Sequence, residues 1–141
     1  MPEKKTLRAA RKDAEEGKAP TTQAGEFVRE EIEHIREGKH GARSAKQAIA
    51  IGLSKARRAG VKLPPPKKGR ASEATRIKAE HDYKKGQKKP NARPSSKRAR
   101  TTEAALKREG RSAASPKALS KQAKQAASAR KRRGKATASK A

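Results

Sequence analysis

Histidine and cysteine, the residues that most often bind metals or activate nucleophiles, are scarce in this 141-residue chain. Cysteine is absent, which removes disulfides, thiolate metal ligands and thiol nucleophiles. The three histidines, His34, His40 and His81, fall on three different predicted elements and show no paired ligand spacing. We therefore expect ordinary structural histidines, no metal site and no cofactor.

The carboxylates offer no better prospect of acid–base catalysis. Glu30, Glu31 and Glu33 are expected on the solvated face of a helix, where they would pair with Arg29 or Arg36. The chain also lacks a glycine-rich phosphate loop and a nucleophile elbow. We expect no catalytic residue and no enzymatic activity.

Cationic side chains are the one chemically distinctive group. The chain has 40 Lys and Arg against 14 Asp and Glu, a formal net charge of +26. Residues 1–37 carry 8 basic and 9 acidic side chains, whereas residues 38–141 carry 32 and 5, so the whole excess follows residue 37. A polycation of this density binds polyanions, and we expect a nucleic-acid partner, most of all duplex DNA, bound through phosphate neutralisation and counterion release.

The cations expected to contact phosphates lie in three regions. They surround a predicted helix at about 44–59, follow the three prolines at 64–66 and recur in the C-terminal tail. A helix N-terminus near Arg43 and Ser44 adds backbone donors for a phosphate oxygen. Only Phe27, Tyr83 and the histidines could stack on bases, which favours duplex over single strands. The predicted set is Lys39, His40, Arg43, Lys46, Lys55, Arg57, Arg58, Lys62, Lys67, Lys68, Arg70, Lys97, Arg98, Arg100, Arg130, Lys131, Arg132 and Arg133.

Large apolar residues limit how much of the chain can fold around a core. Leu, Ile, Val and Phe number 13, about 9% of the chain, a level typical of disorder when net charge is high. We expect a mainly α protein with a small helical hairpin, of helices about 22–37 and 44–59, in a domain of residues 21–66. Gly38 and Gly60 follow these helices as C-terminal glycines.

The two helices of the hairpin have different apolar faces. Val28, Ile32 and Ile35 fall at i, i+4 and i+7 in the first, with Thr22 as its predicted N-cap. In the second, Ser44 and Gln47 have capping-box spacing. Its stripe is mostly small and would let another helix approach closely: Ala45, Ala48, Ile49, Gly52, Leu53 and Ala56.

The regions around the hairpin have weaker patterns. Residues 1–20 predict a marginal helix and a linker, and 67–100 a basic linker with a helix at 72–85, capped by Ser72 and stopped by Gly86. Residues 101–141 form a Lys, Ala and Ser-rich tail, which we expect to be largely disordered or helical on binding. Within it, helical propensity is highest at 102–109 and at 115–133, where Ser115 is the N-cap and Pro116 the first helical residue.

Three segments carry a resemblance to a known family: GEFVREEIEH at 25–34, GKHGARS at 38–44 and KQAIAIGLSKARRAGV at 46–61. Together they resemble a family of small, highly basic bacterial proteins usually labelled DNA-binding and in some cases plasmid-stabilisation proteins. The resemblance implies a bacterial source, a cytoplasmic or nucleoid location and no known catalytic residues. The tail is similar in composition to the tails of linker histones and of bacterial histone-like proteins.

Three functions remain open at this point. The first is non-enzymatic binding of duplex DNA with low sequence specificity, in a histone-like or nucleoid-associated role. The second is a dimerisation or protein-interaction module that uses the stripe of Ala45, Ile49 and Leu53 and is tethered to nucleic acid by its tail. The third is association with RNA or the ribosome, and no membrane span is expected for any of them.

Overall fold

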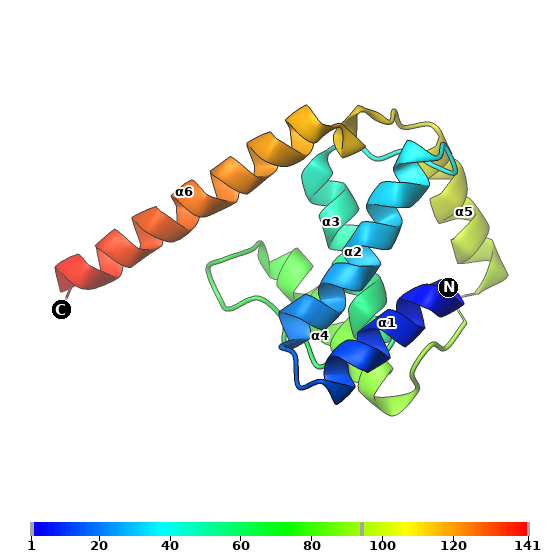
Figure 1. Cartoon of the computed structure of the whole chain (residues 1–141), viewed down its shortest axis with the longest axis horizontal. Helices are drawn as coiled ribbons and strands as arrows, with labels where there is room; N and C mark the ends of the chain where they lie inside the picture. Colours follow the sequence, from blue (N-terminus) through cyan, green and yellow to red (C-terminus); the bar gives the residue numbers. More distant parts are fainter. Residues whose placement is uncertain (1, 94, 141) are drawn as a thin grey trace.

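A computed structural model describes residues 2–93 and 95–140, with side chains as far as residue 135, and this part of the chain is helical and contains no strand (Figure 1). The mainly α fold predicted from the sequence is confirmed. The elements are α1 (Lys4–Glu15), α2 (Pro20–Arg36), α3 (Ala45–Arg58), α4 (Glu73–Lys88), α5 (Ser96–Lys107), a short 3₁₀ turn η1 (Ser112–Ala114) and α6 (Pro116–Lys140).

The predicted hairpin is present as α2 and α3, which pack along each other at the centre of the molecule. The Ser44 Oγ accepts a hydrogen bond from the Gln47 amide at 3.1 Å, and Gln47 Oε1 accepts one from the Arg43 amide at 2.6 Å. The predicted cap at Thr22 is wrong. Proline has a fixed φ suited to the first helical position, and α2 already begins at Pro20.

The small stripe on α3 lets the two helices approach closely. A Cβ atom at Gly52 would lie 2.7 Å from Val28 Cα, closer than packed atoms tolerate. Ala45 and Ala48 of the same stripe are buried within the chain. Ile49 and Leu53 are only partly buried, so a contact of this stripe with a second copy or another protein stays a prediction.

Two clusters of buried apolar residues stabilise the hairpin at its two ends. The first surrounds Phe27, which is 1% exposed, and includes Val61 and Leu63 from the segment after α3. The second contains Ile32 and Ile35 of α2 with alanines of the turn, α3 and η1. Val61 and Leu63 thus cover one end of the hairpin together with Phe27.

Helix α4 packs on α3 through a glycine. Its predicted cap is confirmed, since the Thr75 amide donates to Ser72 Oγ at 3.2 Å. The predicted stop at Gly86 is wrong, because α4 continues to Lys88 and Gly86 is buried within it. A Cβ at Gly86 would overlap the carbonyl oxygen of Arg57, so this position is used for close packing rather than for termination.

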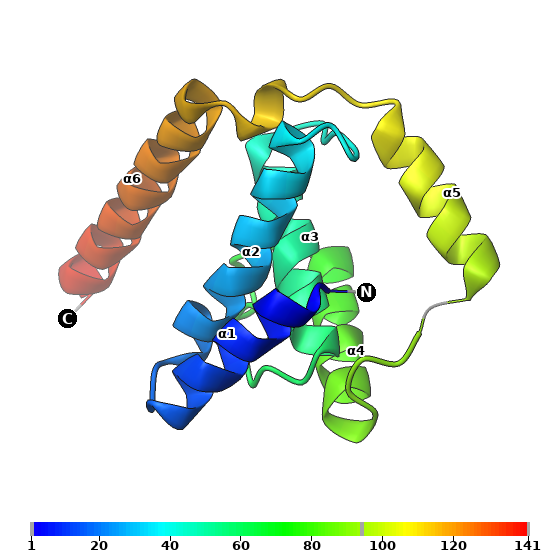
Figure 2. The same ribbon diagram turned by 45° about the vertical axis from the view of Figure 1, so that its right-hand side comes forward.

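The C-terminal region forms two helices on opposite sides of the hairpin (Figures 1 and 2). Helix α6 begins at Pro116 after Ser115, whose Oγ accepts from the Ala118 amide at 3.1 Å, as the sequence predicts. Helix α5 begins earlier than residue 102, because Ser95 caps it through the Arg98 amide at 3.2 Å. Neither α5 nor the described side chains of α6 include a buried residue, so these two helices lie largely outside the core.

The segment between α5 and α6 is nevertheless anchored to the hairpin, a contact the sequence did not predict. The Gly41 amide donates to the Leu106 carbonyl at 2.9 Å, and the Ala42 amide donates to the Gly110 carbonyl at 3.1 Å. Arg36 Nε donates to the Ala114 carbonyl at 3.0 Å. The start of α6 is therefore fixed beside the α2–α3 turn.

The close approach at Gly52 predicts opposite outcomes for two helical glycines. Alanine gains about 1 kcal/mol of helix propensity over glycine, and Gly25→Ala on α2 adds a methyl that meets nothing within 4 Å. Gly52→Ala adds the same propensity but overpacks the helix contact, at a cost of about 1–3 kcal/mol. In urea unfolding, the free energy of unfolding of Gly25→Ala should exceed that of the wild-type protein. The free energy of unfolding of Gly52→Ala should be lower than that of Gly25→Ala by the overpacking cost of about 1–3 kcal/mol. Equal stability of the two variants would contradict the packing.

Candidate nucleic-acid interface

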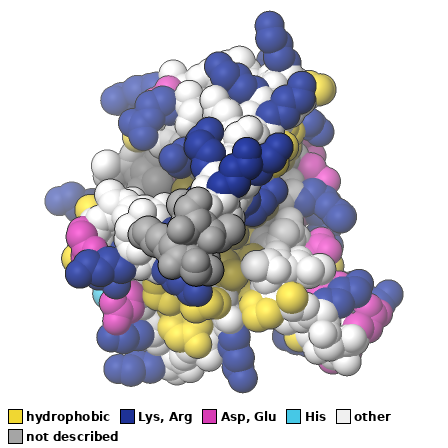
Figure 3. All heavy atoms as spheres, turned by 90° about the vertical axis from the view of Figure 1, so that its left-hand side faces the viewer, with side chains coloured by type: hydrophobic (Ala, Val, Ile, Leu, Met, Phe, Trp, Pro, Cys, Tyr) yellow, Lys and Arg dark blue, Asp and Glu magenta, His cyan; other side chains and the backbone are white. Residues whose placement is uncertain are grey.

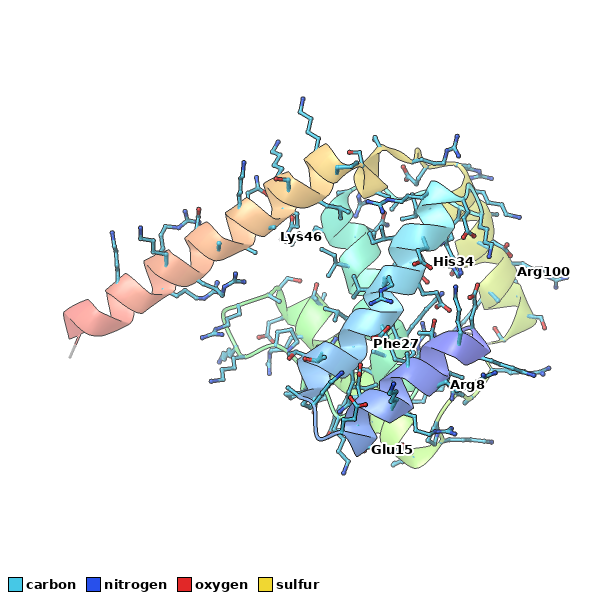
Figure 4. The ribbon with its side chains drawn as sticks, in the orientation of Figure 1. Arg8, Glu15, Phe27, His34, Lys46 and Arg100 are labelled. Carbon is cyan, nitrogen blue, oxygen red and sulfur yellow. The ribbon has the colours of Figure 1, made fainter. Side chains whose placement is uncertain are left out.

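A shallow hollow of about 290 Å³ lies where the start of α3 meets η1 and the first turns of α6. Three cations line it, Arg43 and Lys46 from the start of α3 and Lys121 from α6. No carboxylate lines it, and its remaining polar groups are Ser44, Ser112, Gln122 and Gln125. Figure 4 labels Lys46 at this junction. The hollow is thus a cationic site with hydroxyl and amide groups around it.

The backbone adds to the positive potential of this hollow. The first amides of a helix have no partner within the helix, and the N-terminus carries a partial positive charge. The Ser44 cap satisfies the Gln47 amide and leaves the amides before it at the mouth of the helix. Anions bind favourably in such a position, and this agrees with the donors predicted near Arg43 and Ser44.

Most cations predicted to contact phosphates are exposed, but they do not form one face. Besides the cations near the hollow, one group lies on the connection between α3 and α4, a second on α5 and a third on α6. Since α5 and α6 lie on opposite sides of the hairpin, their cations are separated (Figure 2). Figure 3 shows Lys and Arg side chains dispersed over the face toward which α6 points. The exposed set is Lys39, Arg43, Lys46, Lys62, Lys67, Lys68, Arg70, Lys97, Arg98, Arg100, Arg130, Lys131, Arg132 and Arg133.

Arg57 is wrongly included among the predicted phosphate contacts. Its guanidinium is directed inward, where Nε donates to the Leu63 carbonyl at 3.2 Å and Nη2 to the Pro64 carbonyl at 3.1 Å. The residue is 8% exposed, and burial lowers the pKa of Arg57 below its ordinary value. Arg57 therefore holds the chain entering the triple proline against the end of α3.

Three further predicted contacts are engaged within the fold. Lys55 Nζ forms an ion pair with Glu31 Oε1, and His40 Nε2 lies 3.1 Å from Glu31 Oε2. Arg58 Nε lies 3.9 Å from Asp82 Oδ1 and keeps part of its side chain exposed. These contacts join Lys55 and His40 to α2 and Arg58 to α4, and contact of these three residues with phosphate stays a prediction.

The predicted solvation of Glu30 and Glu31 is wrong. Glu30 is 2% exposed and Glu31 is not exposed at all. Glu30 Oε1 accepts from the Glu3 amide at 2.6 Å and from Thr6 Oγ1 at 3.2 Å, which ties α1 to α2. A signal for Glu31 was present in the sequence, since it falls at i+4 from Phe27 on the face that buries both.

Residues 21–68, about a third of the chain, match a family of unknown function, DUF6496. The matched segment covers α2, α3 and the proline segment that Arg57 holds. Neither the curated proteins nor the solved structures include a match to this chain. Among the described residues, none of the helices is sufficiently long and apolar to span a membrane.

The ion pair of Glu31 and Lys55 predicts a large loss of stability when one partner is removed. Lys55→Met leaves the Glu31 carboxylate buried without its ammonium, and breaking a buried pair in this way costs about 3–5 kcal/mol. Lys46→Met, on the same helix but exposed, should change the free energy of unfolding by no more than about 0.5 kcal/mol. Urea unfolding measures both variants, and comparable losses would show that Lys55 does not stabilise Glu31.

Proposed function

We propose that this protein binds duplex DNA without catalysis and with low sequence specificity, in a histone-like or nucleoid-associated role. The observation that carries the proposal is the acid-free hollow in which Arg43, Lys46 and Lys121 converge at the N-terminus of α3. Three cations and a helix N-terminus around one hollow match the charge and the acceptor atoms of a backbone phosphate. A location at the nucleoid would follow from this function.

The distribution of acidic residues supports the same proposal. Most carboxylates of the N-terminal region are buried or paired with a nearby Lys or Arg, as in Asp13 with Lys18 at 3.0 Å and Glu33 with Lys5 at 3.7 Å. The cations after residue 37 outnumber acidic residues by 32 to 5. The excess positive charge is therefore left on the surface, where it can release counterions from DNA.

The side chains available at the interface favour contacts to the backbone over reading of bases. Gln47, the amide on α3 that could have read a base, accepts the Arg43 amide in the helix cap. Phe27 is buried in the core and offers no surface on which an exposed base could stack. Phosphate contacts carry no sequence information, so low specificity for duplex DNA is expected.

The experiment is a salt series of binding measurements on unrelated DNA duplexes with the full chain. If about eight phosphates are contacted, the slope of log K against log salt should be about −7. The triple variant Arg43→Gln, Lys46→Gln, Lys121→Gln should reduce the magnitude of this slope by about 3 and weaken binding to every duplex. The matched control is Lys4→Gln, Arg11→Gln, Lys12→Gln, which removes the same charge from exposed positions of α1.

Each outcome bears on a different part of the proposal. An equal loss of DNA affinity in the two triple variants would show that binding depends on net charge alone and not on the hollow. Binding that is absent or insensitive to salt would contradict the function itself. Competition with structured RNA completes the test. If structured RNA displaces the bound duplex DNA preferentially, the result would favour an RNA-associated function instead.

A further inference from the structure

A cluster of one buried and two partly buried side chains at the turn of the hairpin has the composition of a metal site. His34 near the end of α2 (labelled in Figure 4) and His40 of the turn have ring centroids 6.1 Å apart. Glu31, His34 and His40 each offer a ligand atom, and the three atoms lie within 4.8 Å of one another. His34 and His40 fall on separate elements in the sequence, but the turn folds His40 back against α2.

The hydrogen bonding of His40 determines which of its nitrogens is available. His40 Nδ1 lies 2.8 Å from the carbonyl oxygen of Gly41. A carbonyl oxygen only accepts hydrogen bonds, so Nδ1 carries the hydrogen. In the neutral ring this leaves a lone pair on Nε2, the atom that lies 3.1 Å from Glu31 Oε2. A histidine that binds a metal ordinarily donates its other nitrogen in this way.

The carboxylate opposite His40 also has an unused oxygen. Lys55 engages Glu31 Oε1 and leaves Oε2, which is buried and has no hydrogen-bond partner among the described residues. Two lone pairs that face each other at 3.1 Å repel unless a cation lies between or beside them. A proton or a metal ion would satisfy both atoms.

The surroundings of His34 supply additional negative charge. His34 Nε2 lies 3.0 Å from Glu3 Oε1, and this hydrogen bond lowers the pKa of Glu3. Lys39 and Lys5 also pair with Glu3. Glu30 has no ion pair in the described part of the chain, and its Oε2 is buried without a hydrogen-bond partner. A buried carboxylate without a cation favours occupation of this cluster by positive charge.

We propose that Glu31, His34 and His40 bind a divalent first-row transition-metal ion of the Zn²⁺ class. Two imidazoles and one carboxylate are ligands that Zn²⁺ accepts, and they suit it better than Mg²⁺ or Ca²⁺, which prefer oxygen ligands alone. The ion would join the end of α2 to the turn that precedes α3. This site is independent of the proposed DNA binding, since none of its ligands lines the cationic hollow.

The test is calorimetric titration of the full, metal-depleted chain with Zn²⁺, supported by Co²⁺ absorption spectra. One ion should bind per chain, and bound Co²⁺ should show the bands of a site with nitrogen ligands. His40→Gln and His34→Gln should each weaken Zn²⁺ binding by at least about 10-fold, the scale on which even supporting residues of a metal site act. The matched control is His81→Gln, an exposed histidine of α4, which should bind as the wild-type chain does.

Three results would overturn the proposal. They are the absence of Zn²⁺ binding to the wild-type chain, binding that is unchanged in both His34→Gln and His40→Gln, and an equal loss in His81→Gln. Circular dichroism of each variant distinguishes a lost ligand from a lost fold. If His40→Gln unfolds, His34→Gln and the Co²⁺ spectrum of the wild-type chain still decide the question.

Discussion

The close approach of α2 and α3 at Gly52 is the constraint on which the rest of the structure depends. The chain has too few large apolar residues to separate its helices by a thick core, so it brings two backbones together over glycine and alanine. Gly86 repeats this arrangement between α4 and α3. With helices this close, single residues such as Phe27 and Ile35 suffice to fill each end of the hairpin.

Close packing also explains the buried charges. Glu30 and Glu31 lie on the face of α2 that the hairpin and α1 cover, and Oε1 of each is engaged by groups from other elements. Buried carboxylates are costly unless hydrogen-bonded or paired, so these contacts define how α1, α2 and α3 fit together. These two acidic side chains thus contribute to the interior, while most lysines and arginines after residue 37 remain exposed, with Lys55 and Arg57 among the exceptions.

How far the sequence predicts this structure differs between local and long-range features. Ser44, Ser72 and Ser115 were predicted as caps because a cap depends on the three or four residues that follow it. The inward direction of Arg57 and the role of Gly86 were not predicted, since both depend on which backbone lies opposite. The docking of η1 was likewise hidden, because alanines at 113 and 114 carry no periodic signal of their own.

The same distinction applies to the candidate interface. Arg43 and Lys46 could be predicted from the start of a helix, but Lys121 joins them only because η1 fixes the first turns of α6 beside that helix.

The proposed function is tested most directly by recovering nucleic acid crosslinked to the full-length protein in cells and sequencing it. The account predicts DNA fragments from throughout the genome with no common sequence. Recovery mainly of RNA, or of DNA from one defined sequence, would contradict it.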